Sequence, residues 1–252
     1  MLNNEERKNS TFKDNGFFVS SKYLNKKHTN KIISNVDRFI SDIVPKMPNT
    51  KVYYDEIKNK DSLKQIQMMF AYDKYFYDLI YDSSIFQIAE KLLEEKPTPI
   101  NLQYFNKAPL WSKPTPPHQD GYYFKINPIK AITLWLALDD VDETNGCISY
   151  YPKSHLHGLR NHVRSGVLGF SQCLPNDDNL LNECNEIRMT CSAGSLLAHD
   201  ALLIHSADKN LSHRPRRSLG FIYYGSSVEI NKNKASEYQK SLDDDLMKKG
   251  LV

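Results

Sequence analysis

The spacing of apolar residues changes near Ile100, and this change limits the possible folds more than any other feature of the chain. Before it, apolar residues recur every three or four positions, which predicts amphipathic helices at about residues 30–44, 63–70 and 85–93. After it, short apolar runs are separated by Gly, Pro and Asn, which indicates short strands joined by turns. Strands are expected at residues 131–138, 147–151, 194–199, 201–205 and 217–224. This pattern is typical of a β-sandwich or β-barrel.

The run AITLWLAL at residues 131–138 predicts which side chains share a face. Neighbouring side chains on a strand point to opposite faces, so Thr133 and Trp135 should lie together on one of them. The four aliphatic residues between and around them should lie on the other face.

The length of 252 residues allows one large domain, and 40% hydrophobic and 25% charged residues are ordinary for a globular protein with a sizeable core. We expect a single domain over residues 1–252. It would have a helical N-terminal part at about 1–98, a strand-rich core at about 99–226, and a charged tail at about 227–252. The tail should be a surface helix or a frayed end.

Composition also excludes several classes of protein. A net charge of +3 argues against nucleic acid as the main partner, which needs clustered positive charge. The four cysteines contain no C-x-x-C pair, the start of the sequence is polar, and no run approaches roughly 18 apolar residues. We therefore expect a cytoplasmic protein with free thiols and no membrane span.

The clearest sign of chemistry is His118-x-Asp120, with His205 far downstream. Two imidazoles and one carboxylate can form a facial triad that suits non-haem Fe(II) and leaves coordination positions open. Extended backbone, which Pro117 favours, would project His118 and Asp120 together. An isolated H-x-D is nevertheless common, so the pair alone is a weak signal.

Other histidines could compete for the same role. His155 and His157, with His162, could bind metal, but they lack a nearby carboxylate and fit polar loop histidines better. His199 precedes Asp200, and it could equally be a core histidine with satisfied hydrogen bonds.

Arg216 lies eleven residues past His205 and strengthens the triad interpretation. On a strand it would share a face with Ser218 and Gly220, which leaves room for a ligand beside the guanidinium. A guanidinium binds a carboxylate through two parallel hydrogen bonds, which suits a dicarboxylate co-substrate. The alternative is a solvated basic cluster with Arg214 and Arg217, and this remains the better interpretation for Arg214.

Three strings of the sequence, in this order and spacing, resemble the phytanoyl-CoA dioxygenase (PhyH) family. They are PPHQDGYYF, TLWLALDDVDETNGCISYYPKSHLHG and GSLLAHDALLIHSADKNLSHRPRRSLGFIYY. The likeness runs from near Phe12 to about Tyr224. It implies a mainly β fold with flanking helices, whose core is a double-stranded β-helix (a cupin-like jelly roll) at about 99–226. It also implies an Fe(II)- and 2-oxoglutarate-dependent oxygenase.

The resemblance assigns roles residue by residue. His118, Asp120 and His205 would bind Fe(II), and Arg216 would pair with the distal carboxylate of 2-oxoglutarate. Three further residues would line the co-substrate pocket, although Trp135 could equally be a core aromatic; they are Trp135, Thr133 and Gln103.

Two positions qualify this assignment. The family often has a serine two residues after the distal histidine, where this chain has Ala207, so one hydrogen bond to the co-substrate is missing or replaced. Related halogenases have a small residue in place of the carboxylate, so Asp120 favours hydroxylation or another oxidation without halide.

We expect the enzyme to use O2 and 2-oxoglutarate to hydroxylate an unactivated C–H bond of a small metabolite or biosynthetic intermediate. It would act as a monomer or homodimer. A coenzyme A thioester follows from the family name only, and an anionic substrate would be favoured if basic residues line the site; these are Lys107, Lys113, Lys125, Arg160 and Arg164. The alternative is a catalytically silent jelly-roll protein that binds metal or ligand.

Overall fold

A seven-stranded antiparallel sheet is the largest element of the fold, with the strand order β1-β12-β7-β14-β4-β3-β2. The computed structural model describes residues 11–56 and 59–248. The strands are β1 Phe17–Ser20, β2 Val52–Tyr54, β3 Leu63–Ile66, β4 Pro97–Lys107, β7 Ala131–Ala137, β12 Leu196–Asp200 and β14 Arg216–Gly225.

A four-stranded antiparallel sheet, in the order β11-β8-β13-β5, packs against the large one. Its strands are β5 Thr115–His118, β8 Ile148–Tyr150, β11 Ile187–Met189 and β13 His205–Ala207. Trp135 and Leu197 of the large sheet share one apolar cluster with Ile148 and Tyr150 of the small sheet. The two sheets therefore face each other, as the expected jelly roll requires.

Strand β7 has the two faces predicted for it. Thr133 and Trp135 point between the sheets and line a cavity there. Ile132, Leu134 and Leu136 join the core on the opposite side of the sheet.

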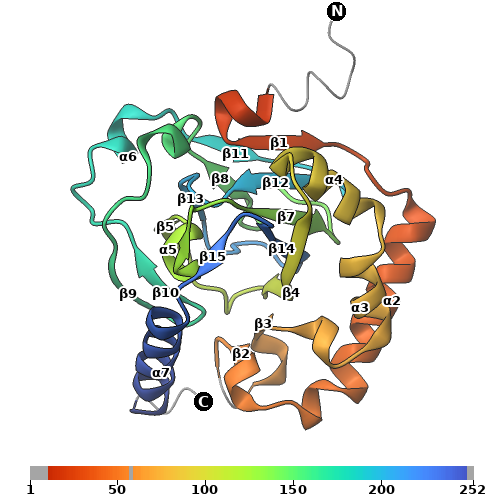
Figure 1. The fold of residues 1–252 in the computed structure, drawn as a ribbon. Coiled ribbons are helices and arrows are strands. Elements are labelled where there is room, and N and C mark those ends of the chain that lie inside the picture. The colour runs from red at the N-terminus through yellow and green to blue at the C-terminus, as the bar shows by residue number, and fades with distance from the viewer. Residues whose placement is uncertain (1–10, 57–58, 249–252) are drawn as a thin grey trace, which may run out of the picture.

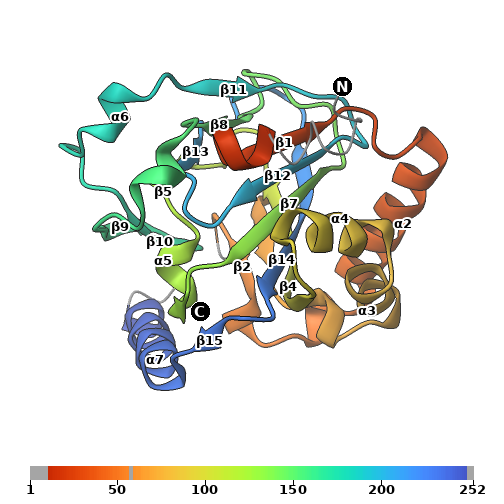
Figure 2. The ribbon, with the colours of Figure 1, turned by 45° about the horizontal axis from the view of Figure 1, so that its top comes forward.

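Three helices cover the outer face of the large sheet, and Figures 1 and 2 both show them together on the right of the molecule. They are α2 Lys26–Asp42, α3 Lys74–Tyr81 and α4 Ser84–Leu93. Each begins after a side-chain cap that accepts a backbone N–H, provided by Asn25, Asp73 and Ser83. Helices α2 and α4 confirm the helices predicted at 30–44 and 85–93.

The helix predicted at 63–70 is wrong. Residues Leu63–Ile66 form β3, which pairs with β4, and only Met69–Ala71 turns into a short 3-10 helix. All four residues of β3 are buried, so no alternation of polar and apolar residues marks the strand. The predicted N-terminal part thus contributes β1, β2 and β3 to the large sheet as well as helices.

The strand predicted at 201–205 is also wrong, because the chain turns there. The Asp200 carboxylate accepts a hydrogen bond from the Leu202 N–H at 2.7 Å, which closes the turn, and only His205 enters the next strand.

The remaining elements lie outside the two main sheets. They are the hairpin β9 Val163–Val167 with β10 Phe170–Cys173, the pair β6 Ile126–Asn127 with β15 Glu229–Ile230, and the helices α5 Gly121–Phe124, α6 Leu180–Glu183 and α7 Lys232–Lys248. The 3-10 helices are Val44–Lys46, Asn49–Lys51, Lys60–Ser62, Met69–Ala71 and Ser154–His157.

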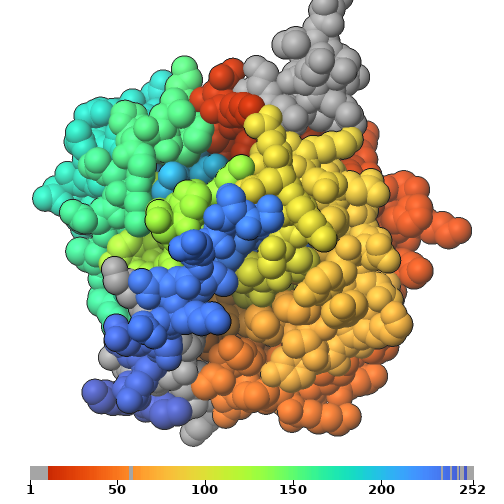
Figure 3. Space-filling model, viewed as in Figure 1, coloured from red at the N-terminus to blue at the C-terminus, as the bar shows by residue number. Residues whose placement is uncertain are grey.

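Helix α7 is the helix expected in the charged tail. Figure 3 shows the C-terminal segment, in blue, on the surface between the green residues and the yellow and orange helical layer. The parts of the predicted domain that fall on residues 1–10, 57–58 and 249–252 lie outside the described residues. Across the described ranges, every helix is too short or too polar to cross a bilayer.

Candidate metal centre

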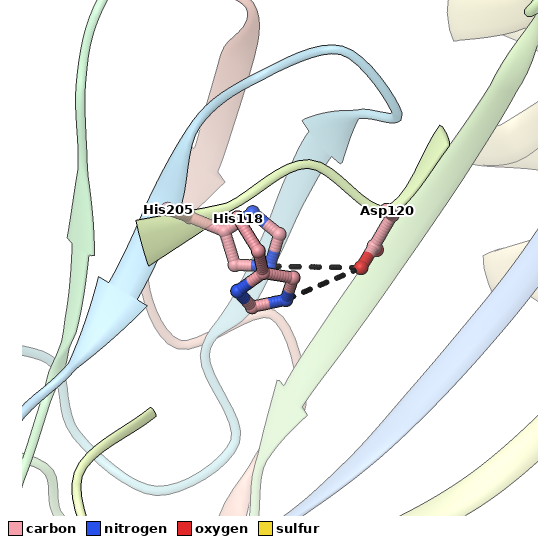
Figure 4. A group of neighbouring side chains, drawn as sticks. All are labelled: His118, Asp120 and His205. Atoms are coloured by element: carbon pink, nitrogen blue, oxygen red, sulfur yellow. Dashed lines mark ion pairs between the residues drawn. The ribbon is translucent and has the colours of Figure 1, made fainter. Parts of the chain in front are cut away.

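His118, Asp120 and His205 converge between the two sheets, as Figure 4 shows. His118 ends β5 and His205 begins β13, and the two are paired across these strands. The Nε2 atoms of His118 and His205 lie 3.6 Å and 3.7 Å from Asp120 Oδ1. One possible ligand atom from each residue lies within 4.8 Å of the others, and no other group in the described ranges meets this geometry.

Asp120 reaches this position through a turn and not through strand alternation, so that part of the prediction is wrong. Its backbone is helical, with φ −58° and ψ −35°, and α5 follows it. The buried side chain of Gln119 holds the turn: its amide donates to the carbonyls of Gly158 and Leu202 at 2.9 Å and 2.6 Å.

Backbone carbonyls orient both imidazoles. The Nδ1 atoms of His118 and His205 lie 2.8 Å and 3.1 Å from the carbonyl oxygens of Pro116 and Leu203. A carbonyl can only accept, so each Nδ1 donates its hydrogen and leaves Nε2 as the ring atom directed towards Asp120 and available to a metal. Burial, and then the neighbouring histidines, lower the pKa of His205 well below its ordinary value, which keeps it neutral. Two imidazoles and one carboxylate fit Fe(II).

The second carboxylate oxygen of Asp120 is also held. Thr133 Oγ1 donates to Oδ2 at 2.6 Å, and His199 Nε2 donates to it at 3.3 Å. Burial alone would raise the pKa of Asp120, but the surrounding histidines outweigh burial and hold it well below its ordinary range. Oδ2 is thus engaged by the protein, and Oδ1 faces the two Nε2 atoms.

His199 is the residue whose part in the site was missed. It is a buried core histidine with hydrogen-bonded ring nitrogens, which is one of the alternatives that the sequence allows. The Tyr150 hydroxyl donates to its Nδ1 at 2.9 Å. Its other partner is the candidate ligand Asp120. His199 pairs with Thr133 across β12 and β7, and the sequence does not reveal this register.

We predict that Thr133→Val lowers Fe(II) affinity about ten- to a hundredfold, since outer hydrogen bonds that orient a ligand typically contribute this much. Valine keeps the size of threonine and removes only the donor to Asp120. A competition titration with a coloured Fe(II) chelator measures the change. Thr98→Val, on the exposed start of β4, is the matched control, and equal affinities for the two variants would contradict the prediction.

Arg216 points into the same space as the triad. Its side chain is buried, its Nε donates to the Gly146 carbonyl at 3.1 Å, and its guanidinium carbon lies 5.3 Å from the ring centre of Trp135. Burial lowers its pKa to about 10, so it stays a cation near neutral pH. Within the described residues Arg216 has no carboxylate in an ion pair. By contrast, Arg214 pairs with Asp142, outside this site.

A cavity of about 70 Å³ connects these groups, and the other predicted pocket residues also line it. Its lining includes the triad and Arg216, together with Gln103, Thr133, Trp135, His199 and Ala207. The competing histidines lie elsewhere: His155 contacts the carbonyl of Lys13, and His162 accepts from the Gln119 N–H.

A second cavity, of about 350 Å³, opens on the other side of His118 and Asp120. One wall carries amides, and the rest is mainly aromatic; the main residues are Gln65, Gln67, Asn101, Gln103, Tyr123, Phe124, Phe170, Tyr224, Tyr238 and Leu242. Helix α7 contributes Tyr238 and Leu242 to this lining, and the Tyr238 hydroxyl lies 2.6 Å from that of Ser171. Among the described residues that line this cavity, His118 is the only histidine and Asp120 is the only carboxylate.

Comparison with known proteins agrees with this geometry. The sequence profile of "Phytanoyl-CoA dioxygenase (PhyH)" matches residues 12–218. A phytanoyl-CoA dioxygenase of Arabidopsis thaliana is 31% identical over 146 residues, which cover 58% of this chain and 51% of that protein. The chain therefore spans about half the length of the curated relatives it matches.

Solved structures share the fold at low sequence identity. EctD from S. alaskensis with bound Fe superposes with a TM-score of 0.77 at 15% identity, over 92% of this chain and 82% of that one. The epimerase SnoN, in complex with Fe3+, alpha ketoglutarate and nogalamycin RO, gives 0.70 at 20% identity, over 90% and 85%. These matches confirm the double-stranded β-helix fold.

Proposed function

Since this chain belongs to the phytanoyl-CoA dioxygenase family, an Fe(II)- and 2-oxoglutarate-dependent oxygenase family, we propose that it is a dioxygenase that hydroxylates an unactivated C–H bond of a small molecule. His118, Asp120 and His205 bind Fe(II) in this proposal, and Arg216 binds the distal carboxylate of 2-oxoglutarate. The proposal keeps the cytoplasmic location and the monomeric or homodimeric state expected from the sequence.

One observation carries the proposal: a buried arginine without a carboxylate partner in the described residues shares a small cavity with an N,N,O ligand set. A buried cation is costly unless an anion pairs with it. A dicarboxylate would satisfy the guanidinium at one end and reach the ligand set at the other.

A metal bound by these residues would supply the oxidising chemistry, in which 2-oxoglutarate and O2 yield succinate and CO2. The protein residues orient the reactants. Two carbonyls keep the imidazole lone pairs aimed inwards, and Thr133 and His199 hold Asp120. Trp135 stacks beside the Arg216 guanidinium and limits its movement.

We propose that the substrate occupies the larger cavity and is small and uncharged. Its volume of about 350 Å³ is at the low end for ligand pockets. The amides of Gln65 and Asn101 favour neutral hydrogen-bonding groups, and the buried Gln65 Oε1 has no partner in the described protein. The aromatic wall favours an apolar or ring-shaped body.

The basic residues that would have favoured an anionic substrate do not line this larger cavity. Lys107 and Lys113 border the smaller one, and the Lys125 ammonium donates to the Tyr122 carbonyl. Arg160 pairs with Asp178, and Arg164 donates to Ser241. The larger cavity therefore offers no basic side chain as a partner for an anionic group beside the reacting centre.

The test is an anaerobic mixture of the protein with Fe(II) and 2-oxoglutarate. We expect a visible metal-to-ligand charge-transfer band, and succinate release once O2 is admitted with a substrate. Absence of the band in the wild-type protein would contradict the proposal. Metal binding without succinate from any member of a metabolite panel would instead support the silent binding protein.

We also predict that Arg216→Met weakens 2-oxoglutarate binding about a hundredfold, since truncating one partner of a buried charge pair costs several kcal/mol. Titration of the charge-transfer band measures this dissociation constant. Arg214→Met removes an exposed arginine from the same loop and serves as the control. Equal affinities for the two variants would exclude Arg216 as the anchor.

A further inference from the structure

Lys107 and Arg216 are two buried cations that face each other across neighbouring strands. They are directly paired in the register of β4 and β14, so their side chains emerge on the same face of the sheet. Lys107 is 5% exposed and Arg216 is 4% exposed. Both contact Gly146, since a Cβ there would meet the Lys107 side chain and the Arg216 Nε donates to its carbonyl.

No acidic group of the described protein neutralises this pair through an ion pair. The nearby Lys64 is different, because its ammonium lies 3.2 Å from Asp55 Oδ1. The Lys107 ammonium donates only to the Lys113 carbonyl, at 2.9 Å, which leaves two of its three N–H groups without a protein partner among the described residues. Burial, and then Arg216, lower the pKa of Lys107 well below its ordinary value. Like charges placed directly opposite each other destabilise a sheet unless an anion lies between them.

The space beside this pair is the smaller cavity. Lys107, Arg216 and Ala207 all line it together with the candidate metal ligands. The Ala207 methyl offers no hydrogen-bond donor to a ligand in this cavity. An ammonium with two available N–H groups can donate to an anion in this cavity and adds charge.

We propose that Lys107 is a second binding residue for the distal carboxylate of 2-oxoglutarate, which it shares with Arg216. This inference rests on the proposed function. The carboxylate accepts hydrogen bonds from both cations and relieves their mutual repulsion.

Lys107→Met tests the proposal with two ligands. 2-Oxobutyrate has the same 2-oxo acid end as 2-oxoglutarate but lacks the distal carboxylate. Anaerobic titration of the Fe(II) charge-transfer band should show a dissociation constant for 2-oxoglutarate raised about ten- to a hundredfold, as for a lost charged hydrogen bond. The constant for 2-oxobutyrate should change less than about twofold, because that ligand does not reach Lys107. Lys209→Met, on the exposed surface, should change neither constant.

Each other outcome has a distinct meaning. Unchanged 2-oxoglutarate affinity in Lys107→Met would overturn the role of Lys107 and leave the proposed function standing. Equal weakening of both ligands would also overturn it, since the lysine would then act only on the shape of the site. A wild-type protein that develops no band with 2-oxoglutarate would refute the proposed function itself. If Lys107→Met does not fold, Lys107→Gln, which keeps donors for the Lys113 carbonyl without the charge, gives the same comparison.

Discussion

Asp120→Ala should lower Fe(II) affinity more than about a hundredfold, and we expect no charge-transfer band with 2-oxoglutarate at micromolar metal. Loss of an outer hydrogen bond to a ligand typically costs ten- to a hundredfold, and loss of the ligand itself costs more. The substitution removes the one negative charge among the three candidate ligands. Thr133 and His199, which both donate to this carboxylate, would be left without their partner.

Asp177→Ala is the matched control, because Asp177 is an exposed aspartate whose loss should leave the band intact. Asp120→Asn separates charge from packing, since it keeps the shape and one oxygen. Thermal melting without metal should show that all three variants fold. A full band in Asp120→Ala, at the wild-type metal concentration, would exclude Asp120 as a ligand.

Phe39→Ala should lower the free energy of unfolding by about 3–5 kcal/mol, the usual cost of truncating a fully buried phenylalanine. Phe39 of α2 is 0% exposed and packs edge-to-face on Phe76 of α3, with the ring centres 5.3 Å apart. The same apolar cluster contains Leu134 and Phe221, from β7 and β14. The cavity would therefore open where the helices meet the large sheet.

Urea denaturation followed by circular dichroism measures this loss. Tyr77→Ala is the control on the same helical layer, because Tyr77 is 48% exposed and its truncation should cost about 0.5 kcal/mol. A loss below about 1 kcal/mol for Phe39→Ala would show that the helical layer stabilises the sheet far less than its burial implies.

The sequence was sufficient to predict features that depend on spacing within one element. Strand β7 and helix α4 follow from apolar periodicity, and both faces of β7 lie where that periodicity puts them. The prediction failed where the same apolar residues are compatible with a helix and with a buried strand. Leu63 and Ile66 are three positions apart, as on a helix, but they belong to a strand buried on both faces. Pairing with β4 makes these residues a strand, and strand pairing depends on residues that are distant in the sequence.

The candidate site shows the same division. H-x-D, a distant histidine and an arginine on a strand are visible along the chain, and the structure brings them to one cavity. His199 lies opposite Thr133, and Lys107, the proposed second anchor, lies opposite Arg216, each across neighbouring strands. Strand register sets those neighbours, so no motif in the linear sequence marks either residue.

Helix α7 has an evolutionary consequence. The family match ends at residue 218, whereas Tyr238 and Leu242 of α7 line the larger cavity. If that cavity holds the substrate, part of the lining that selects it lies beyond the segment that carries the oxidising centre. Mutations in the last turns of the chain could then change the accepted molecule while every residue around the metal stays fixed. Such an arrangement lets the same oxidation be redirected to new compounds by variation in one peripheral helix.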